Sequence, residues 1–558
     1  MSRRAEKSGP LAGEVYRIPF DGDPKQLPTK DTVGSKAHNL MRLAGCGLPV
    51  PPAFVLGTGI CRDFLKRGSK ALDGLDQILE RELQHLGART GRLLGDAKRP
   101  LLLSVRSGAA ISMPGMMETV LNVGLTEATL RALIRMIGNP RLAHDCRRRL
   151  VQQYGEVVHG IAPERFEKRL EAVLAELEAT DVDELGASGL RRIAAAFEEE
   201  FESANGKPFP SDPNLQLEAA IEAVFRSWAG ARAKSYRKLN RIPEDLGTAV
   251  IVQAMVFGNL GPDSGSGVGF TRNPSDGSNE LYVDYLSNAQ GEDVVSGRRR
   301  AMGLADLERR APAAHRALID ARALLEREFR DVQDFEFTVE DGRLFLLQSR
   351  TGKRTPLAAL RIAHDLAEEG LISAAEALER LQSIDLAAIE NVRLRPTAAQ
   401  TALMRGTSAS AGIAIGAVVF DPARVGPLKQ RKKPLILVRP TADTSDIGAL
   451  SEAAALITVD GARTSHAAVV ARQIGIVCVV GCEGLAIDPS GRRGTFGSEA
   501  VEEGEVVSVD GAKGEVYRGA IEVHSERPTE LLAKIEQWRE SEGPASRRRP
   551  AAPRKRRR

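Results

Sequence analysis

The chain has 558 residues, of which 42% are hydrophobic and 27% are charged, as in ordinary globular proteins. This length exceeds what one hydrophobic core accommodates and predicts two to four domains. No apolar run is long enough to cross a bilayer and the first residues lack the apolar stretch of a signal peptide, so we expect no membrane span and a cytoplasmic location.

The net charge of +4 depends on the C-terminal tail. Between Ser546 and Arg558 there are eight basic residues and no acidic one, and without them the side-chain total becomes −4. The tail has no apolar periodicity, which predicts disorder. It is interpreted either as an electrostatic arm for nucleic acid, anionic lipid or another anionic partner, or as a dispensable solvated extension, which we favour.

The five cysteines are sparse and odd in number, which argues against a secreted disulfide scaffold. Cys478 and Cys482 have a spacing seen in metal sites, but no second ligand pair accompanies them. We therefore expect two small buried thiols.

The N-terminal part alternates between predicted strands and helices. A glycine turn leads into an amphipathic helix at 34–43, a strand covers 101–109, and the pattern from about 127 to 203 is helical and highly charged. Strands return at 249–257. Two further strands, 335–339 and 343–348, are predicted to form a hairpin around the turn Asp341-Gly342.

The C-terminal part begins with helices at 356–381 and a polar stretch at 393–407 that is typical of a linker. From about 406 to 521 the chain shows short strands and glycine turns, with one helix after His466.

Three groups of residues in the first 355 positions suit a nucleotide. Lys36 follows a glycine turn and Arg106 lies in a strand, and two such cations match the spread negative charge of a triphosphate. Alternating glycines, among them Gly265 and Gly267, precede a predicted strand, where backbone amides can approach phosphate oxygens. The alternative for this glycine run is a flexible hairpin tip.

The third group spans the predicted hairpin. Asp334 and Glu336 are two residues apart on one strand and therefore share a face, and Gln348 and Arg350 repeat this spacing on the other. Two carboxylates and an amide oxygen form an all-oxygen set that suits Mg²⁺, with Arg350 beside it for phosphate.

His466 lies between a predicted buried strand at 455–460 and a short helix. A glycine turn and the pair Thr464-Ser465 place it at the helix N-terminus, where the helix dipole disfavours imidazolium and favours a bound anion. A neutral imidazole in this position is suited to accept and carry a phosphoryl group. The alternative is a purely structural role, in which His466 is a capped histidine in the core.

Several segments together resemble the pyruvate phosphate dikinase family over about residues 31–521. The resemblance rests on the runs 104–119, 256–259, 288–295, 348–354 and 464–466. It implies an ATP-grasp nucleotide-binding domain at 1–355 with a helical insertion at about 127–205, a helical connector and linker at 356–405, a swivelling β/β/α phosphohistidine domain at 406–522, and a final helix-like segment and basic tail at 523–558. The fold class is thus multidomain α/β and α+β.

The resemblance also implies roles for single residues. Lys36, Arg106 and Arg350 would hold the ATP phosphates, with Glu336 and Gln348 on Mg²⁺ and Asp334 nearby. Arg148 or Arg149 would supply a further phosphate contact, and His466 would be the carrier. Thr464 matches the position at which plant members are regulated by phosphorylation.

Two departures from the family pattern are visible. The family has Gly-Gly-Met before Thr-Ser-His, whereas this chain has Gly461-Ala462-Arg463. The family continues into a (β/α)₈ barrel that binds pyruvate and phosphoenolpyruvate, and the sequence given contains no counterpart of that barrel. We therefore expect the acceptor site on another chain, either a separate barrel or a phosphocarrier protein.

The leading hypothesis is a dikinase-like phosphotransferase that uses ATP, Mg²⁺ and inorganic phosphate to phosphorylate His466. The alternative is a non-catalytic, degenerate nucleotide-binding or regulatory protein derived from the same family, and association with nucleic acid through the tail is a third reading. The sequence leaves the oligomeric state open, a homodimer included.

Overall fold

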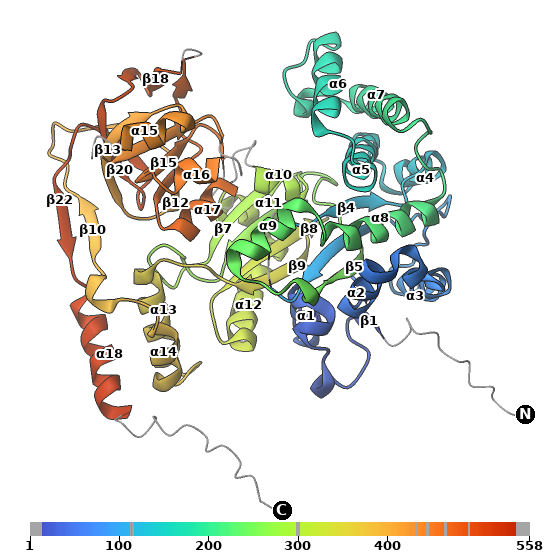
Figure 1. Ribbon diagram of the computed structural model, residues 1–558, viewed down its shortest axis with the longest axis horizontal. Helices are drawn as coiled ribbons and strands as arrows, with labels where there is room; N and C mark the ends of the chain where they lie inside the picture. The colour runs from blue at the N-terminus through green and yellow to red at the C-terminus, as the bar shows by residue number, and fades with distance from the viewer. Residues whose placement is uncertain are drawn as a thin grey trace, which may run out of the picture. The chain divides into compact units, whose positions relative to one another are not determined.

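A computed structural model describes residues 14–111, 113, 116–296, 302–429, 434–441, 446–461, 466–488 and 491–542. It divides into two compact units, one comprising residues up to Gly265 together with Phe337–Arg350, and the other Ser266–Glu336 together with Thr351 onward. The chain is mixed α/β throughout (Figure 1). The domain boundaries predicted from the sequence do not follow these units and stay a prediction.

The core of the first unit is a five-stranded antiparallel sheet in the order β1-β2-β5-β3-β4. Its strands are β1 (Val15–Ile18), β2 (Ala53–Leu56), β3 (Leu103–Ala109), β4 (Thr119–Val123) and β5 (Thr248–Ala254). Every residue of β2 and β5 is buried, because both lie inside the sheet and are covered by helices. The strands predicted at 101–109 and 249–257 are thereby confirmed, with shorter ends.

Helices of this unit pack on the sheet and extend from it. They are α1 (Lys30–Gly45), α2 (Thr58–Arg67), α3 (Leu75–Thr90), α8 (Pro213–Ser227) and α9 (Ala231–Asn240). In α1 the apolar side chains of Val33, Ala37 and Leu40 recur at helical spacing and are fully buried, which explains why this segment docks as a helix.

The charged segment predicted as helical contains four helices between Glu127 and Asn205. They are α4 (Glu127–Ile137), α5 (Pro140–His159), α6 (Pro163–Glu176) and α7 (Ala187–Asn205), and α5 and α7 lie side by side (Figure 1). Local signals set their ends: a Thr126–Thr129 capping box starts α4, and Asn139 caps α5, which has proline at its first position.

A four-stranded sheet in the order β7-β6-β8-β9 follows. Its strands are β6 (Gly265–Phe270), β7 (Tyr282–Ser287), β8 (Gln333–Glu340) and β9 (Arg343–Thr351). Asp341 and Gly342 both have positive φ, 49° and 73°, as a two-residue turn between twisted strands requires. The predicted hairpin is therefore confirmed.

The structure corrects the placement of the glycine run. Gly265 and Gly267 lie inside β6 and are buried, rather than in a loop before a strand. The neighbouring Gly269 shows why the strand needs small residues, since a Cβ there would lie 2.7 Å from the Phe335 ring on β8. Close packing of neighbouring strands, which the sequence pattern does not reveal, explains the difference.

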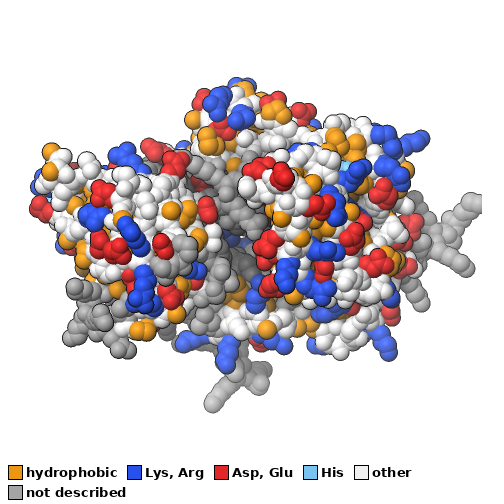
Figure 2. Space-filling view, turned by 90° about the horizontal axis from the view of Figure 1, so that it is seen from above, with side chains coloured by type: hydrophobic (Ala, Val, Ile, Leu, Met, Phe, Trp, Pro, Cys, Tyr) orange, Lys and Arg blue, Asp and Glu red, His pale blue; other side chains and the backbone are white. Residues whose placement is uncertain are grey.

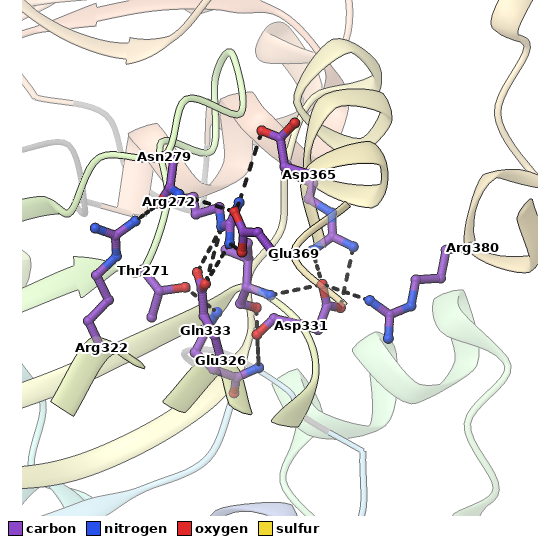
Figure 3. Close-up of polar contacts among 12 residues, drawn as sticks. Thr271, Arg272, Asn279, Arg322, Glu326, Asp331, Gln333, Asp365, Glu369 and Arg380 are labelled. Carbon is purple, nitrogen blue, oxygen red and sulfur yellow. Dashed lines mark hydrogen bonds and ion pairs between the residues drawn. The ribbon is translucent and has the colours of Figure 1, made fainter. Parts of the chain in front are cut away.

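Three helices accompany this sheet: α10 (Gly291–Ser296), α11 (Leu304–Arg310) and α12 (Pro312–Phe329). A buried ionic cluster joins α12 to the strands (Figure 3). The Arg272 guanidinium donates to both oxygens of Glu326, at 3.0 and 2.8 Å, and to both oxygens of Glu369, at 3.0 and 2.6 Å. Burial opposes the charge on Arg272, yet these carboxylates raise its pKa further above the ordinary value.

Glu369 directly follows α13 (Pro356–Glu368), which with α14 (Ala374–Leu381) confirms the helices predicted at 356–381. The C-terminal helix α18 (Thr529–Glu542) packs on both, and Ile535 is buried in their shared core. The final segment was expected to be helix-like, and α18 bears this out. The basic tail lies outside the described residues.

The stretch predicted as a linker contains strands. β10 (Asn391–Leu394) pairs with β22 (Val523–Glu526), and β11 (Ala402–Arg405) pairs with β21 (Glu515–Arg518). These partners are more than a hundred residues away, and strands of four residues carry little periodicity of their own. Polar composition alone therefore gave the wrong structure for this stretch.

The rest of the second unit is built on an eight-stranded sheet in the order β11-β21-β20-β13-β14-β15-β16-β12. The strands not yet given are β12 (Thr407–Ser410), β13 (Ile413–Val419), β14 (Leu435–Arg439), β15 (Ala455–Thr458), β16 (Val477–Val480) and β20 (Val506–Asp510). From β13 to β16 neighbouring strands are parallel. Helices α15 (Val425–Lys429), α16 (Ile447–Leu450) and α17 (His466–Ile474) accompany this sheet, and a small sheet is formed by β17 (Leu485–Ile487), β18 (Arg493–Phe496) and β19 (Glu499–Glu502).

The expectation of two small buried thiols is confirmed. Cys478 and Cys482 are buried, and burial raises the pKa of each thiol to about 12. No described helix has the length and apolar character needed to cross a membrane. On the face seen in Figure 2, cationic and anionic side chains are interspersed, with hydrophobic ones scattered among them.

Candidate phosphoryl-transfer site

The first candidate feature is a set of three cations, Lys36, Arg106 and Arg350, carried by segments of the first unit. Lys36 follows Gly34, which interrupts α1 with φ 77° and approaches β3 so closely that a Cβ would lie 2.0 Å from Gly108 O. Ser35 Oγ donates to Ala109 O at 2.9 Å. The start of α1 is thereby fixed against the end of β3, the strand that carries Arg106.

Arg106 is in turn tied to β9. Its Nη1 donates to Leu347 O at 3.0 Å and lies 3.5 Å from Oε1 of the buried Gln253. From α1, Asn39 Nδ2 donates to Ser349 O at 2.7 Å, next to Arg350. The fold thus brings the segments of Lys36, Arg106 and Arg350 together, although they are far apart in the sequence.

Sequence reasoning missed Asn39 and Gln253. Asn39 is 7% exposed and lies three residues after Lys36, so both belong to one side of α1. A polar residue at that spacing on an otherwise apolar helix face was the available signal. The sequence carried no such signal for Gln253, because it is a single polar residue inside an apolar strand.

The predicted metal ligands lie on neighbouring strands. Asp334 and Glu336 are on β8 and Gln348 is on β9, and Asp334 is buried. Among the described residues no group of three or more His, Cys, Asp or Glu side chains is placed to hold a metal ion. Two carboxylates and an amide oxygen are chemically suited to a hard divalent cation, and their role as ligands of Mg²⁺ stays a prediction.

Arg148 and Arg149, the candidates for a further phosphate contact, both pair with Asp145 on the same helix, at 2.6 and 3.0 Å. Asn259 Nδ2 also donates to this carboxylate, at 3.2 Å. Burial tends to raise the pKa of Asp145, but the two guanidinium groups outweigh it and the pKa lies below the usual value. The carboxylate is therefore held charged inside the helical segment.

Asp145→Asn is expected to lower the free energy of unfolding by about 2–3 kcal/mol near neutral pH, because two partly buried cations lose their partner. A lowered folded-state pKa stabilises the protein above the unfolded-state pKa of about 4 and loses this effect as pH falls through the folded-state pKa. Denaturant titrations of both proteins should therefore converge in acid. Glu127→Gln, which removes an exposed pair at 3.8 Å, serves as control, and a pH-independent difference for Asp145→Asn would refute this explanation.

A second candidate feature, described by itself in the other unit, is the start of α17. Strand β15 ends at Thr458, and Val459 N and Asp460 N donate to Arg439 O and Pro440 O at 3.1 and 2.9 Å, so the exit of this strand is fixed to the end of β14. Gly461 then turns the chain with φ 134°, a conformation that side-chain-bearing residues rarely adopt.

Helix α17 begins at His466, so the strand, the glycine turn and the helix predicted here are confirmed. The helix is seated on the parallel strands through the buried Ala468 and Ala471. Thr464 and Ser465 lie outside the described residues, as does the side chain of His466. Their predicted roles stay predictions.

Comparisons with known proteins identify two family matches in this chain. Residues 73–302 match the family "Pyruvate phosphate dikinase, AMP/ATP-binding domain", and residues 431–514 match "PEP-utilising enzyme, mobile domain". A pyruvate, phosphate dikinase of Rhizobium meliloti is 42% identical over 521 residues, which cover 91% of this chain and 58% of the relative. The chain belongs to the pyruvate phosphate dikinase family.

Other members of the dikinase family give the same result. The pyruvate, phosphate dikinase of Clostridium symbiosum is 40% identical over 513 residues, 91% of this chain and 59% of the relative. The chloroplastic pyruvate, phosphate dikinase 1 of Zea mays is 42% identical over 492 residues, 88% of this chain and 52% of the relative. The chain therefore spans little more than half the length of these relatives, and its similarity to them supports an ATP-binding phosphotransferase.

Proposed function

We propose that this protein transfers a phosphoryl group from ATP to His466 and then onward to an acceptor. In this proposal the first 355 residues form an ATP-grasp nucleotide-binding domain, and residues 406–522 form a swivelling β/β/α domain that carries the histidine. The observation that supports it best is the joining of α1, β3 and β9 through Ser35, Arg106 and Asn39, which gathers the segments of three cations.

The roles proposed for these residues follow from charge. Lys36, Arg106 and Arg350 bind the phosphate oxygens and hold the transferred group in line, which supplies most of the catalysis in a loose transition state. Asp334, Glu336 and Gln348 would hold Mg²⁺, which would supply positive charge to neutralise the phosphate groups.

The proposed reaction balances with inorganic phosphate as second acceptor, as the relatives' name suggests. The histidine nitrogen attacks the β-phosphorus, the bond to AMP breaks, and the γ-phosphoryl group leaves on inorganic phosphate as pyrophosphate. His466 acts as nucleophile and must be neutral to do so. The helix dipole at the start of α17 opposes its protonation.

Isotope labelling tests this proposal. ATP labelled at the β-phosphate is expected to label the protein in a Mg²⁺-dependent way, whereas inorganic phosphate should move the label of γ-labelled ATP from the protein into pyrophosphate. His466→Ala should retain no label, and the label should be lost in acid, as from a phosphohistidine. Binding of ATP without any AMP formed would support the nucleotide-binding alternative instead.

The acceptor proposed is pyruvate, which the relatives' name specifies, and one experiment tests whether residues 1–558 suffice for the transfer. Purified β-labelled protein is mixed with pyruvate alone and with pyruvate plus a full-length dikinase whose carrier histidine is replaced. Transfer only in the second mixture supports a separate acceptor site. Labelled phosphoenolpyruvate formed by this chain alone would contradict it.

A further inference from the structure

The helix that begins at His466 carries a cation near its other end. Arg472 lies six residues after His466 on α17, is partly buried, and its Nη1 donates to Ala409 O of β12. The sequence showed this arginine without indicating a role for it. Its surroundings are formed by more than the sheet on which α17 lies.

The other side of Arg472 meets the strands of the four-stranded sheet, within the same compact unit. Its guanidinium lies 5.7 Å from the centre of the Phe270 ring on β6. Burial lowers the pKa of Arg472, and the nearby Tyr282, Asp334 and Asp284 counter this effect. Tyr282 Oη also donates to Ser408 O on β12 at 2.7 Å, so β7 and β12 are joined directly.

The charges at this contact are complementary. Asp284 is 5% exposed and Asp334 is 7% exposed, so both carboxylates are removed from water, and both raise the pKa of Arg472 through their charge. Opposite charges buried in one region contribute little net stability, because desolvation offsets their attraction, but leaving one of them buried without the others is strongly unfavourable. This arrangement of charges favours one position of α17 against the strands over other positions.

The position of Arg472 also determines where His466 lies. Six residues of α-helix rise about 9 Å, so a fixed Arg472 fixes the position of the helix start along its axis. Asp334 also lies two residues before Glu336, on the strand proposed to hold the metal. One acidic strand therefore serves both the proposed nucleotide site and the helix of the carrier.

We propose that Arg472 is a positioning residue, whose contact with Phe270, close to the buried carboxylates of Asp284 and Asp334, holds α17 on the nucleotide-binding strands while His466 accepts phosphate. This inference rests on the proposed function. Arg472 makes no contact with ATP in this role. It acts by aligning the nucleophile, for which a displacement of about 1 Å costs on the order of 10²-fold in rate.

A charge exchange tests the role. R472E is expected to slow β-phosphate labelling of the protein about 10²-fold with an unchanged Kd for ATP, and R472K to slow it less. R472E combined with D284R should recover at least tenfold over R472E alone. Lys513→Glu, which reverses an exposed cation of the same domain, is the control and should label at the wild-type rate.

The outcomes separate this inference from the proposed function. Wild-type protein that gains no His466-dependent label refutes the function itself, whatever Arg472 does. Normal labelling by R472E, or a folded double variant with no recovery, refutes the positioning role. Should R472E not fold, D284N alters only the partner strand, and it must slow labelling at least tenfold with ATP binding intact for the inference to stand.

Discussion

Arg106→Met is expected to slow AMP formation by about 10²–10³-fold at saturating ATP, because one preorganised donor to the transferring group is lost. The side chain also ties β3 to β9 through Leu347 O, so its loss relaxes the segment that carries Arg350. Both effects act on the same step. The rate is measured in single turnovers by quenching and separating labelled AMP.

Arg106→Lys is the informative partner of this variant. It retains the positive charge but loses the planar fork that contacts both protein and phosphate, so an intermediate rate is expected. Arg131→Gln on α4 removes an exposed arginine in the same unit and should leave the rate unchanged. A rate within threefold of wild type for Arg106→Met would remove Arg106 from the site.

Arg272→Met is expected to cause the largest loss of stability in the second unit. Arg272 is 1% exposed and its pair Glu326 is 8% exposed, so the substitution leaves a buried carboxylate without its cation. Removing one partner of a buried pair costs about 3–5 kcal/mol. For a unit of this size that corresponds to a fall in melting temperature on the order of 10 °C.

Differential scanning calorimetry measures this effect. Arg539→Met on α18 breaks an exposed pair with Glu536 and should change stability by less than about 1 kcal/mol. Glu369 is more exposed than Glu326, so Glu369→Gln is expected to cost less than Arg272→Met. Equal melting temperatures for wild type and Arg272→Met would show that the cluster does not hold α12 and α13 to β6.

The parts of the fold that the sequence predicted correctly are those specified locally. The turn Asp341-Gly342 and the strand–glycine–helix order around His466 follow from residues within a few positions of each other. The prediction of a linker missed two strands, because β10 and β11 are short and polar. They pair with β22 and β21, far along the chain. The sequence of residues 391–405 alone does not indicate that these strands pair with such distant partners.

The candidate site divides in the same way. Charge and spacing were enough to select Lys36, Arg106 and Arg350 as candidates. The tertiary structure was needed to find Asn39 and Gln253, whose amides hold the segments together. Arg472 was visible as a cation near a helix end, but the acidic residues that act on it come from β7 and β8, more than a hundred residues earlier.

The stoichiometry of one turnover tests the relay through His466 most directly. Protein in excess over β-labelled ATP, with Mg²⁺ and inorganic phosphate, is quenched at intervals, and AMP and protein-bound phosphate are counted together. We predict one phosphate on the protein for each AMP formed, and neither product with His466→Ala. AMP formed at the wild-type rate by His466→Ala would contradict the account.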